Sequence, residues 1–221
     1  PEALQQQLRH FIRDAVLELG SASAIMACQA GRLGLRTAFV GKMGDDAFGR
    51  LLAKTLQERG VDTRAIIVDP ALRTGITVHL SRPDDRASLT YLGSIAAFRS
   101  EEVPIELVRQ SRHLHASSIF FQPGLAEGLP SLFKAARDLG LSTSVDPGWD
   151  PGGRWREPLD ELLPLLDLFF PNEQELYHVT RSSDLEEALR LAGRTVPTVV
   201  VKLGARGAAA WQRDVLYIEP P

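Results

Sequence analysis

The sequence predicts an α/β protein with a doubly wound, mainly parallel sheet and a small β-hairpin that acts as a lid. Short apolar segments alternate with helix-like patterns through most of the 221 residues, and this alternation is typical of parallel sheets covered by helices. Several expected strands end in polar or glycine-bearing turns, as in sheets that bind ligands at one edge. Two strands between residues 74 and 92 are joined by a Pro-Asp-Asp turn rather than a helix.

Composition and charge favour one soluble domain over residues 1–221, with the hairpin at about 74–92 as its appendage. The net charge of −3 provides no basic surface for nucleic acid, and no apolar run is long enough to span a bilayer. Cys28 is the single cysteine, so an internal disulfide is excluded. Because the N-terminus also lacks a signal-peptide pattern, we expect a cytoplasmic protein without nucleic-acid or membrane partners.

The N-terminal residues 1–19 allow two interpretations, because their apolar residues suit one helical face while residues 15–19 also suit a strand. Small residues at 20–24 then precede a helix expected over about 24–33, which Gly34 ends. Small side chains at a helix start leave space and free N–H groups for a ligand, or simply permit close packing. Spacing alone leaves both possibilities open.

The stretch Gly41-Lys42-Met43-Gly44-Asp45-Asp46-Ala47-Phe48-Gly49 is expected to form a turn between a strand at 37–40 and a helix at 48–59. Its three glycines tolerate positive φ and a close approach of other groups. Its two acidic residues precede the helix N-terminus, where the helix dipole favours negative charge. The sequence therefore predicts a polar turn at the end of a strand, where open α/β sheets bind ligands.

The remaining elements follow the same alternation of apolar periodicity and turn signals. Helices are expected at 107–110, 125–139, 159–165, 174–179 and 184–192. Strands are expected at 65–68, 74–80, 87–92, 113–121, 142–145, 166–170, 196–203, 208–211 and 215–218.

Polar groups follow many of these strands, and each group alone has an ordinary explanation because Asn, Asp, Pro and Gly are common turn formers. The groups lie at residues 41–46, 122–123, 146–147, 172–175 and 204–207. In a doubly wound sheet the carboxyl ends of the parallel strands share one edge. We therefore expect these residues to converge on one binding crevice.

The order of these motifs resembles that of the ribokinase-like (PfkB) sugar kinases, which have a Rossmann-like α/β fold. Residues 20–49 are similar to the first signature of the family, with small residues, a helix ending in Leu33-Gly34, a strand and Gly-x-x-Gly-x-Asp-x-x-Gly. The hairpin resembles the family's lid. Asn172-Glu173-Gln174-Glu175 is similar to its Asn-x-x-Glu motif, and residues 202–207 resemble its nucleotide-side strand and turn.

The resemblance implies ATP-dependent phosphorylation of a sugar hydroxyl, with ATP and Mg²⁺ as cofactors and a small-molecule sugar as the substrate. It places the following residues at the sugar: Gly20, Ser21, Ser23, Gly41, Asp46, Tyr91, Gln122 and Asp146. It places the following residues at the nucleotide: Asn172, Lys202, Gly204 and Gly207. Glu175 is the expected metal residue and would organise magnesium and water near the phosphates.

The chain departs from the family pattern at two positions. Ile25 or Ala24 stands where many members carry Asn, and Gly148 stands where some relatives carry Asn. The family's second signature, a Gly-Ala-Gly-Asp turn with the catalytic Asp, is expected beyond Pro221. We therefore expect the catalytic residue outside these 221 residues, and the isolated chain to be inactive or nearly so.

Alternative functions also fit the sequence. A non-catalytic carbohydrate- or nucleotide-binding module would retain the crevice without turnover, and a nucleoside kinase of the same fold would differ in its substrate. A nicotinamide dehydrogenase is disfavoured because Gly-x-Gly-x-x-Gly does not follow a first strand. The hairpin lid also suggests pairing across a homodimer, by fold-level analogy.

Overall fold

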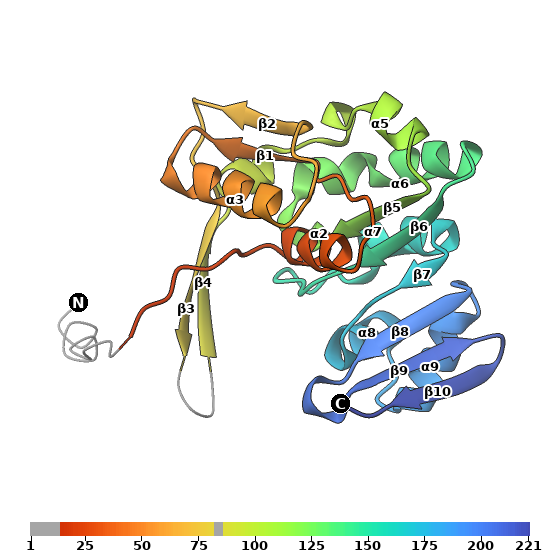
Figure 1. The fold of residues 1–221 in the computed structure, drawn as a ribbon. Coiled ribbons are helices and arrows are strands. Elements are labelled where there is room, and N and C mark those ends of the chain that lie inside the picture. The colour runs from red at the N-terminus through yellow and green to blue at the C-terminus, as the bar shows by residue number, and fades with distance from the viewer. Residues whose placement is uncertain (1–13, 82–85) are drawn as a thin grey trace.

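The computed structural model describes residues 14–81 and 86–221, without the side chain of Arg86. Its largest sheet has six strands in the order β10-β9-β8-β7-β6-β5 (Figure 1). The neighbouring pairs from β5 to β8 are parallel, and β9 and β10 continue the sheet as antiparallel strands. These strands are β5 (His113–Ser117), β6 (Ser142–Asp146), β7 (Leu168–Phe169), β8 (Thr198–Lys202), β9 (Ala208–Gln212) and β10 (Val215–Glu219).

Four helices pack on one face of this sheet: α6 (Pro123–Asp138), α7 (Arg156–Leu162), α8 (Glu173–Thr180) and α9 (Leu185–Gly193). They bury an apolar core that contains Phe133 from α6, Phe169 from β7 and Leu189 from α9, each fully inaccessible to solvent. Burial of side chains of this size contributes about 1.5–3 kcal/mol each relative to exposure. The alternation of buried and less buried side chains along the strands therefore determines which face of the sheet packs against these helices.

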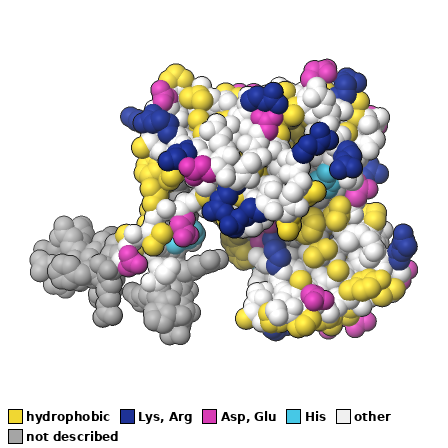
Figure 2. All heavy atoms as spheres, viewed as in Figure 1, with side chains coloured by type: hydrophobic (Ala, Val, Ile, Leu, Met, Phe, Trp, Pro, Cys, Tyr) yellow, Lys and Arg dark blue, Asp and Glu magenta, His cyan; other side chains and the backbone are white. Residues whose placement is uncertain are grey.

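The opposite face is covered differently along its length. In Figure 1 the helix α2 (Ala22–Arg32) lies across β5 on the side away from α6. The face of β8–β10 that points away from α9 carries Val200, Ala210 and the half-exposed Tyr217. Hydrophobic side chains gather in this C-terminal part of the molecule in Figure 2. Within the described residues, no helix covers that face.

The N-terminal part of the chain forms a smaller parallel unit. The strands β1 (Gly41–Gly44) and β2 (Ile66–Asp69) pair in parallel, with α3 (Ala47–Glu58) between them in sequence. A separate apolar cluster joins α2 to α3 through Ala24, Ala27 and Leu56. The unit also contacts the main core of the large sheet. Val40, directly before β1, and Ile67 in β2 pack against that core.

The predicted hairpin is present as β3 (Ile76–Ser81) and β4 (Arg86–Tyr91), paired only with each other among the described strands. One face of this ribbon is apolar and exposed, with Val78 at 48%, Leu89 at 62% and Tyr91 at 54% of their accessible surface. The other face is polar and carries hydrogen bonds between the side chains of Thr77 and Thr90 and between those of His79 and Ser88. A two-stranded ribbon is marginally stable alone, so its apolar face is available for further contacts.

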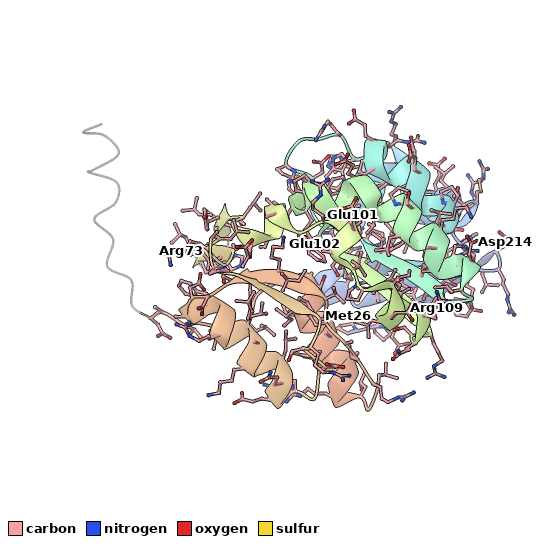
Figure 3. All side chains as sticks on the ribbon, turned by 90° about the horizontal axis from the view of Figure 1, so that it is seen from above. Met26, Arg73, Glu101, Glu102, Arg109 and Asp214 are labelled. Carbon is pink, nitrogen blue, oxygen red and sulfur yellow. The ribbon has the colours of Figure 1, made fainter. Side chains whose placement is uncertain are left out.

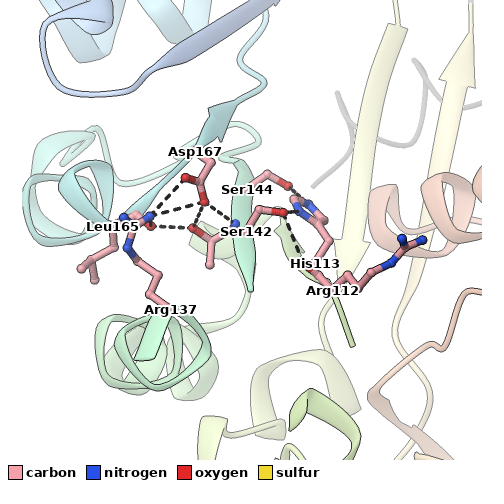
Figure 4. Close-up of polar contacts among 8 residues, drawn as sticks. Arg112, His113, Arg137, Ser142, Ser144, Leu165 and Asp167 are labelled. Carbon is pink, nitrogen blue, oxygen red and sulfur yellow. Dashed lines mark hydrogen bonds and ion pairs between the residues drawn. The ribbon is translucent and has the colours of Figure 1, made fainter. Parts of the chain in front are cut away.

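Polar contacts hold the amino ends of the central strands together (Figure 4). The His113 ring lies 2.8 Å from Ser142 Oγ and 2.7 Å from Ser144 Oγ. Burial lowers the pKa of the neighbouring His115 to about 4, so that ring is neutral at physiological pH. Hydrogen bonds to serine hydroxyls on β5 and β6 thus hold both histidine rings against these strands.

Most expected elements are confirmed, but several boundaries differ. Residues 14–20 form neither helix nor strand, so the strand interpretation of 15–19 is wrong; residues 1–13 lie outside the described part. The first strand is Gly41–Gly44 rather than 37–40, where the structure has only an isolated bridge at Ala38. The expected strand at 113–121 ends at Ser117, because Ser118 adopts a left-handed conformation (φ 53°). None of the described helices combines the length and the apolar character needed to cross a bilayer.

Candidate active site

Three parallel strands deliver polar side chains to one edge of the sheet. Lys202 Nζ at the end of β8 lies 2.5 Å from Asp146 Oδ2 at the end of β6. Asn172, three residues after the end of β7, forms a parallel bridge with Lys202. The predicted convergence of Asp146, Asn172 and Lys202 is therefore observed, and it follows from the shared direction of the parallel strands.

The Asn-x-x-Glu motif forms a capping box at the start of α8. Asn172 accepts a hydrogen bond from the Glu175 backbone N–H at 2.9 Å, and Glu175 accepts one from the Asn172 backbone N–H at 2.8 Å. Glu175 also accepts a bond from Asn172 Nδ2 at 2.6 Å. Only 4% of Glu175 is exposed, and this burial raises the pKa of its carboxyl group, against the opposing influence of the Asn172 hydrogen bond and of Lys202.

A pocket of about 310 Å³ opens beside these residues. Its lining combines one cation, polar side chains and an indole ring. The lining residues are Trp149, Asn172, Glu173, Gln174, Lys202 and Leu203. Two of the four predicted nucleotide residues, Asn172 and Lys202, thus line a single pocket.

The turn after β8 follows the pocket residues Lys202 and Leu203 directly in the sequence. Gly204 and Gly207 bracket the 3₁₀ turn Gly204–Arg206, and both have positive φ, at 58° and 86°. A side chain at Gly207 would collide with the backbone that follows β10. Arg206 donates to Glu173 at 2.6 Å, and this bond lowers the pKa of the Glu173 carboxyl group.

Two unusual backbone conformations meet at the ends of β5 and β6. Gly148 has φ 69°, and a Cβ added to it would lie 2.9 Å from the Ser118 Cα, whose own φ is 53°. This contact gives a structural reason for glycine at position 148. The predicted sugar residue Gln122 lies at the same edge, where its Nε2 donates to the Ser117 carbonyl at 2.6 Å.

The glycine-rich turn after β1 is held by Asp46. Its two carboxylate oxygens accept backbone N–H groups from Thr74 at 2.8 Å and from Gly49 at 2.9 Å. These bonds lower the pKa of Asp46 to about 2. Gly44 lies so close to the backbone at Leu72 that a Cβ would approach the carbonyl oxygen to 2.5 Å. The spacing of Gly44, Asp46 and Gly49 thus has a structural cause in the contact between the turn and residues 72–74.

The other predicted sugar residues are distributed over the N-terminal unit and the hairpin. Ser21 is the N-cap of α2, with φ 70° and a hydrogen bond from the Ala24 N–H at 3.4 Å. Gly20 precedes it without regular structure, and Ser23 lies in the first turn of the helix. Gly41 is buried at the start of β1, and Tyr91 ends β4. No measured contact joins these residues to the pocket at Lys202.

The structure also reveals residues that the sequence interpretation missed. Trp149 lines the pocket and its ring lies 5.0 Å from that of Trp155, which stacks on His178 at 4.8 Å. An aromatic residue directly after the Asp-Pro-Gly turn was the available signal.

Lys42 pairs with Glu102 at 2.6 Å and has only 10% of its side chain exposed. Figure 3 shows Glu102 in the turn Ser100–Glu102, next to α6.

The residues present fit a nucleotide and magnesium. Lys202 and Arg206 supply positive charge for phosphate groups, and positive-φ glycines let a ligand approach the backbone. Both Glu175 oxygens already accept bonds from Asn172. Magnesium usually keeps several of its waters and takes few protein ligands, so Glu175 and Asn172 suit a role in ordering those waters.

Comparisons with known proteins agree with this geometry. The chain is 28% identical over 207 residues to fructokinase-1 of Zea mays, a match that covers 88% of this chain and 64% of that protein. It is 30% identical to a nucleoside kinase of Methanothermobacter thermautotrophicus, with 90% and 63% covered. The solved structure of Xylella fastidiosa fructokinase with bound ATP superposes with a TM-score of 0.79 at 22% identity, covering 91% of this chain and 66% of that one.

The superposition establishes the fold, and a match to a family pattern over most of the chain establishes the family. The superposition shows a ribokinase-like α/β fold, as the order of the motifs implied. The chain spans slightly less than two thirds of the length of the curated relatives described above. Residues 15–221 match the pattern of the pfkB carbohydrate kinases, and the chain belongs to the pfkB family of carbohydrate kinases.

Proposed function

We propose that the protein containing this chain transfers the γ-phosphoryl group of ATP to the hydroxyl of a sugar. The observation that carries this proposal is the convergence of Asp146, Asn172 and Lys202 at the carboxyl ends of three parallel strands, where Asn172 and Lys202 line one pocket. Family membership supports it independently.

The nucleotide would lie along the turn after β8. Lys202 would neutralise phosphate charge once it is released from Asp146. The open space beside Gly204 would admit the nucleotide close to the backbone, and Gly207 would border it at the end of the same turn. The hydroxyl oxygen attacks the γ-phosphorus, the bond to the ADP oxygen breaks, and the hydroxyl proton passes to a base. Such chemistry depends mostly on positioning and charge neutralisation. We assign the base to none of the described residues.

Magnesium would be held near the phosphates with the help of Glu175 and Asn172. When bound, magnesium would neutralise part of the negative charge on the γ-phosphoryl group that is transferred. The capping box keeps the Glu175 carboxylate next to Asn172, and the raised pKa of Glu175 indicates a site that gains from a nearby cation.

The sugar would bind between the N-terminal unit and the sheet edge. The glycine turn with Gly41 and Asp46, the start of α2 with Gly20, Ser21 and Ser23, and the edge residues Gln122 and Asp146 are the proposed contacts. Tyr91 on the hairpin would cover the sugar from the lid. The exposed apolar face of the hairpin also suits pairing across a homodimer, and we place the protein in the cytoplasm, where ATP is abundant and a single cysteine remains reduced.

The test is a kinase assay on the full protein with ATP, Mg²⁺ and panels of sugars and nucleosides. We expect a sugar to be phosphorylated, and Lys202→Met to raise the KM for ATP by about tenfold, as expected for loss of a charge-assisted hydrogen bond. Lys134→Met is the matched control, because Lys134 pairs with Asp138 on the exposed surface of α6. Equal KM values for the two variants would contradict the assignment of Lys202.

A nucleoside kinase is the second candidate, favoured by the 30% identity to the Methanothermobacter enzyme. Turnover of nucleosides in preference to sugars in the same panel would select it. Tight sugar binding measured by calorimetry, with no turnover of any acceptor, would instead indicate a binding module.

A further inference from the structure

A nearly buried ion pair joins the N-terminal unit to the main body of the protein, and the proposed phosphoryl transfer does not use it. Lys42 is the second residue of β1, and its Nζ lies 2.6 Å from Glu102 Oε1. The same Nζ donates to the Ala97 carbonyl at 3.3 Å. Among the ion pairs of residues 14–81 and 86–221, Lys42 is the least exposed cation, at 10% of its side chain. Loss of either partner would leave a poorly hydrated charge without its counterpart, which is costly.

Glu102 is fixed to the main body on its other side. Its Oε2 accepts the Arg99 N–H at 2.9 Å, so both carboxylate oxygens have partners. The turn Ser100–Glu102 packs against α6. Its contact with the helix is so close that a Cβ on Gly128 of α6 would collide with the Ser100 hydroxyl. Since α6 packs on the large sheet, Glu102 is a fixed point of that sheet's helical layer.

The strand that carries Lys42 holds both ends of the hairpin. Before β3, the Thr74 hydroxyl accepts the Gly44 N–H at 2.9 Å. After β4, the fully inaccessible Ser94 donates its hydroxyl to the Lys42 carbonyl at 2.8 Å. The Ser94 N–H also donates to the Arg73 carbonyl at 2.8 Å, which ties the two ends of the hairpin to each other. The base of the hairpin is therefore attached to the backbone of β1 at residues 42 and 44.

A continuous series of contacts thus runs from the large sheet to the hairpin. The helix α6 holds Glu102, Glu102 holds Lys42, and β1 holds the hairpin base and leads into the glycine turn with Asp46. In the proposed function, the acceptor contacts this turn and the hairpin, whereas the nucleotide lies at the edge of the large sheet. Transfer between them requires alignment, and a misplacement of about 1 Å can cost about 100-fold in rate.

We propose that Lys42 and Glu102 are positioning residues, whose ion pair sets the place of the glycine turn and of the hairpin base relative to the sheet edge. This inference rests on the proposed function and deepens it. Neither side chain touches a substrate in the proposal. Hydrogen bonds fix both distance and direction, so the pair holds the acceptor side in one place relative to the nucleotide side.

The test compares Glu102→Gln with Glu101→Gln in the full protein; both glutamates are labelled in Figure 3. Glu101 is 69% exposed and lies 3.5 Å from Arg99, and an exposed pair of this kind contributes little. We expect Glu102→Gln to raise the KM for the acceptor by about tenfold, because it removes a charged hydrogen-bond partner, and to leave the KM for ATP unchanged. Glu101→Gln should leave both values unchanged. A merely structural pair would lower the free energy of unfolding without changing the ratio of the two KM values.

Hydrogen exchange provides a second readout that does not require turnover. In Glu102→Gln, the N–H groups of Gly44 and Ser94 at the hairpin base should exchange faster than in Glu101→Gln, whereas those of β6 should exchange at the same rate. If the unaltered protein phosphorylates no acceptor, the proposed function fails, and the exchange rates still decide whether the pair holds the hairpin base.

Glu102→Asp keeps the charge but shortens the side chain, so its effects should lie between those of Glu102→Gln and the unaltered protein. It also replaces Glu102→Gln in both measurements should that variant fail to fold. The proposal is overturned if the variants at position 102 exchange like Glu101→Gln at Gly44 and Ser94. It is also overturned if the KM for ATP rises as much as the KM for the acceptor.

Discussion

At the amino end of β6, Asp167 accepts a hydrogen bond from the Thr143 N–H at 2.8 Å and lies 3.3 Å from Arg137 Nη1, which also donates to the Leu165 carbonyl (Figure 4). At the carboxyl end of the same strand, Asp146 lies 2.5 Å from Lys202. Both pairs join a carboxylate to a cation between neighbouring elements, and both are partly exposed. The second pair includes Lys202, which lines the pocket described above.

The difference comes from what surrounds each pair. At the amino end, Asp167 and Arg137 bind backbone groups of β6 and of the residues before β7, so the pair holds the strands together. At the carboxyl end, the chain leaves the strands through residues with positive φ, such as Ser118 and Gly148, and through a helix start at Asn172. The direction of the strand, rather than the residue type, thus separates an ion pair that holds strands together from one that, in our proposal, lies at the nucleotide site.

The largest effect is expected for Glu175→Gln at the carboxyl end. Glutamine keeps the size of the side chain but removes the charge that orders Asn172 and, in our proposal, the magnesium waters. Kinase activity should fall by about 10- to 100-fold, as for outer residues that orient metal ligands, while circular dichroism shows a folded protein. Glu186→Gln on the exposed surface of α9 is the control, and an equal loss of activity in both variants would contradict the assignment.

An intermediate effect is expected for Asp167→Asn at the amino end. The substitution weakens a charge-assisted bond to the Thr143 N–H and the contact with Arg137, so the free energy of unfolding should fall by about 1 kcal/mol. Urea unfolding measures it, and activity per folded molecule should stay unchanged. Asp138→Asn, which breaks an exposed pair with Lys134, should cost close to nothing. A loss of activity in Asp167→Asn without a loss of stability would remove the distinction between the two ends.

The smallest effect concerns Asp46, whose contacts resemble those of Asp167 more than those of Asp146. Its pKa in the folded protein is about 2, below the ordinary value of 3.8, because it accepts N–H groups of Thr74 and Gly49. The stabilisation is therefore complete above pH 3.8 and is lost as the pH falls toward about 2. The stability difference between the unaltered protein and Asp46→Asn, measured by urea unfolding, should shrink over this window. A difference independent of pH would show that the carboxylate does not hold the turn.

The sequence predicts the elements well where local chemistry decides them. Gly34, Gly60 and Gly140 were readable as helix ends, and each has positive φ after a helix. The capping box of Asn172 and Glu175 follows from their spacing, because a helix start brings the first and fourth residues of such a motif together.

Features set by distant contacts were harder to predict. Gly41 and Gly44 indicate a turn locally, yet they form a strand because residues 41–44 pair in parallel with the distant residues 66–69. The Lys202–Asp146 pair spans 56 residues, and only the assumption of a parallel sheet brought its partners to one edge. The position of Trp149 at the pocket was not predicted. The preceding Asp-Pro-Gly sequence already accounted for a turn there, so the tryptophan suggested no separate role.

The central claim is that ATP binds at the carboxyl ends of β6, β7 and β8. The most direct test is a crystal structure of the full protein with a non-hydrolysable ATP analogue and Mg²⁺. We predict phosphate density within hydrogen-bonding distance of Lys202, with the nucleotide along Gly204 and Gly207 and the metal near Asn172. Nucleotide density at the amino ends of the strands, near His113 and Asp167, with the Lys202–Asp146 pair untouched, would contradict the account.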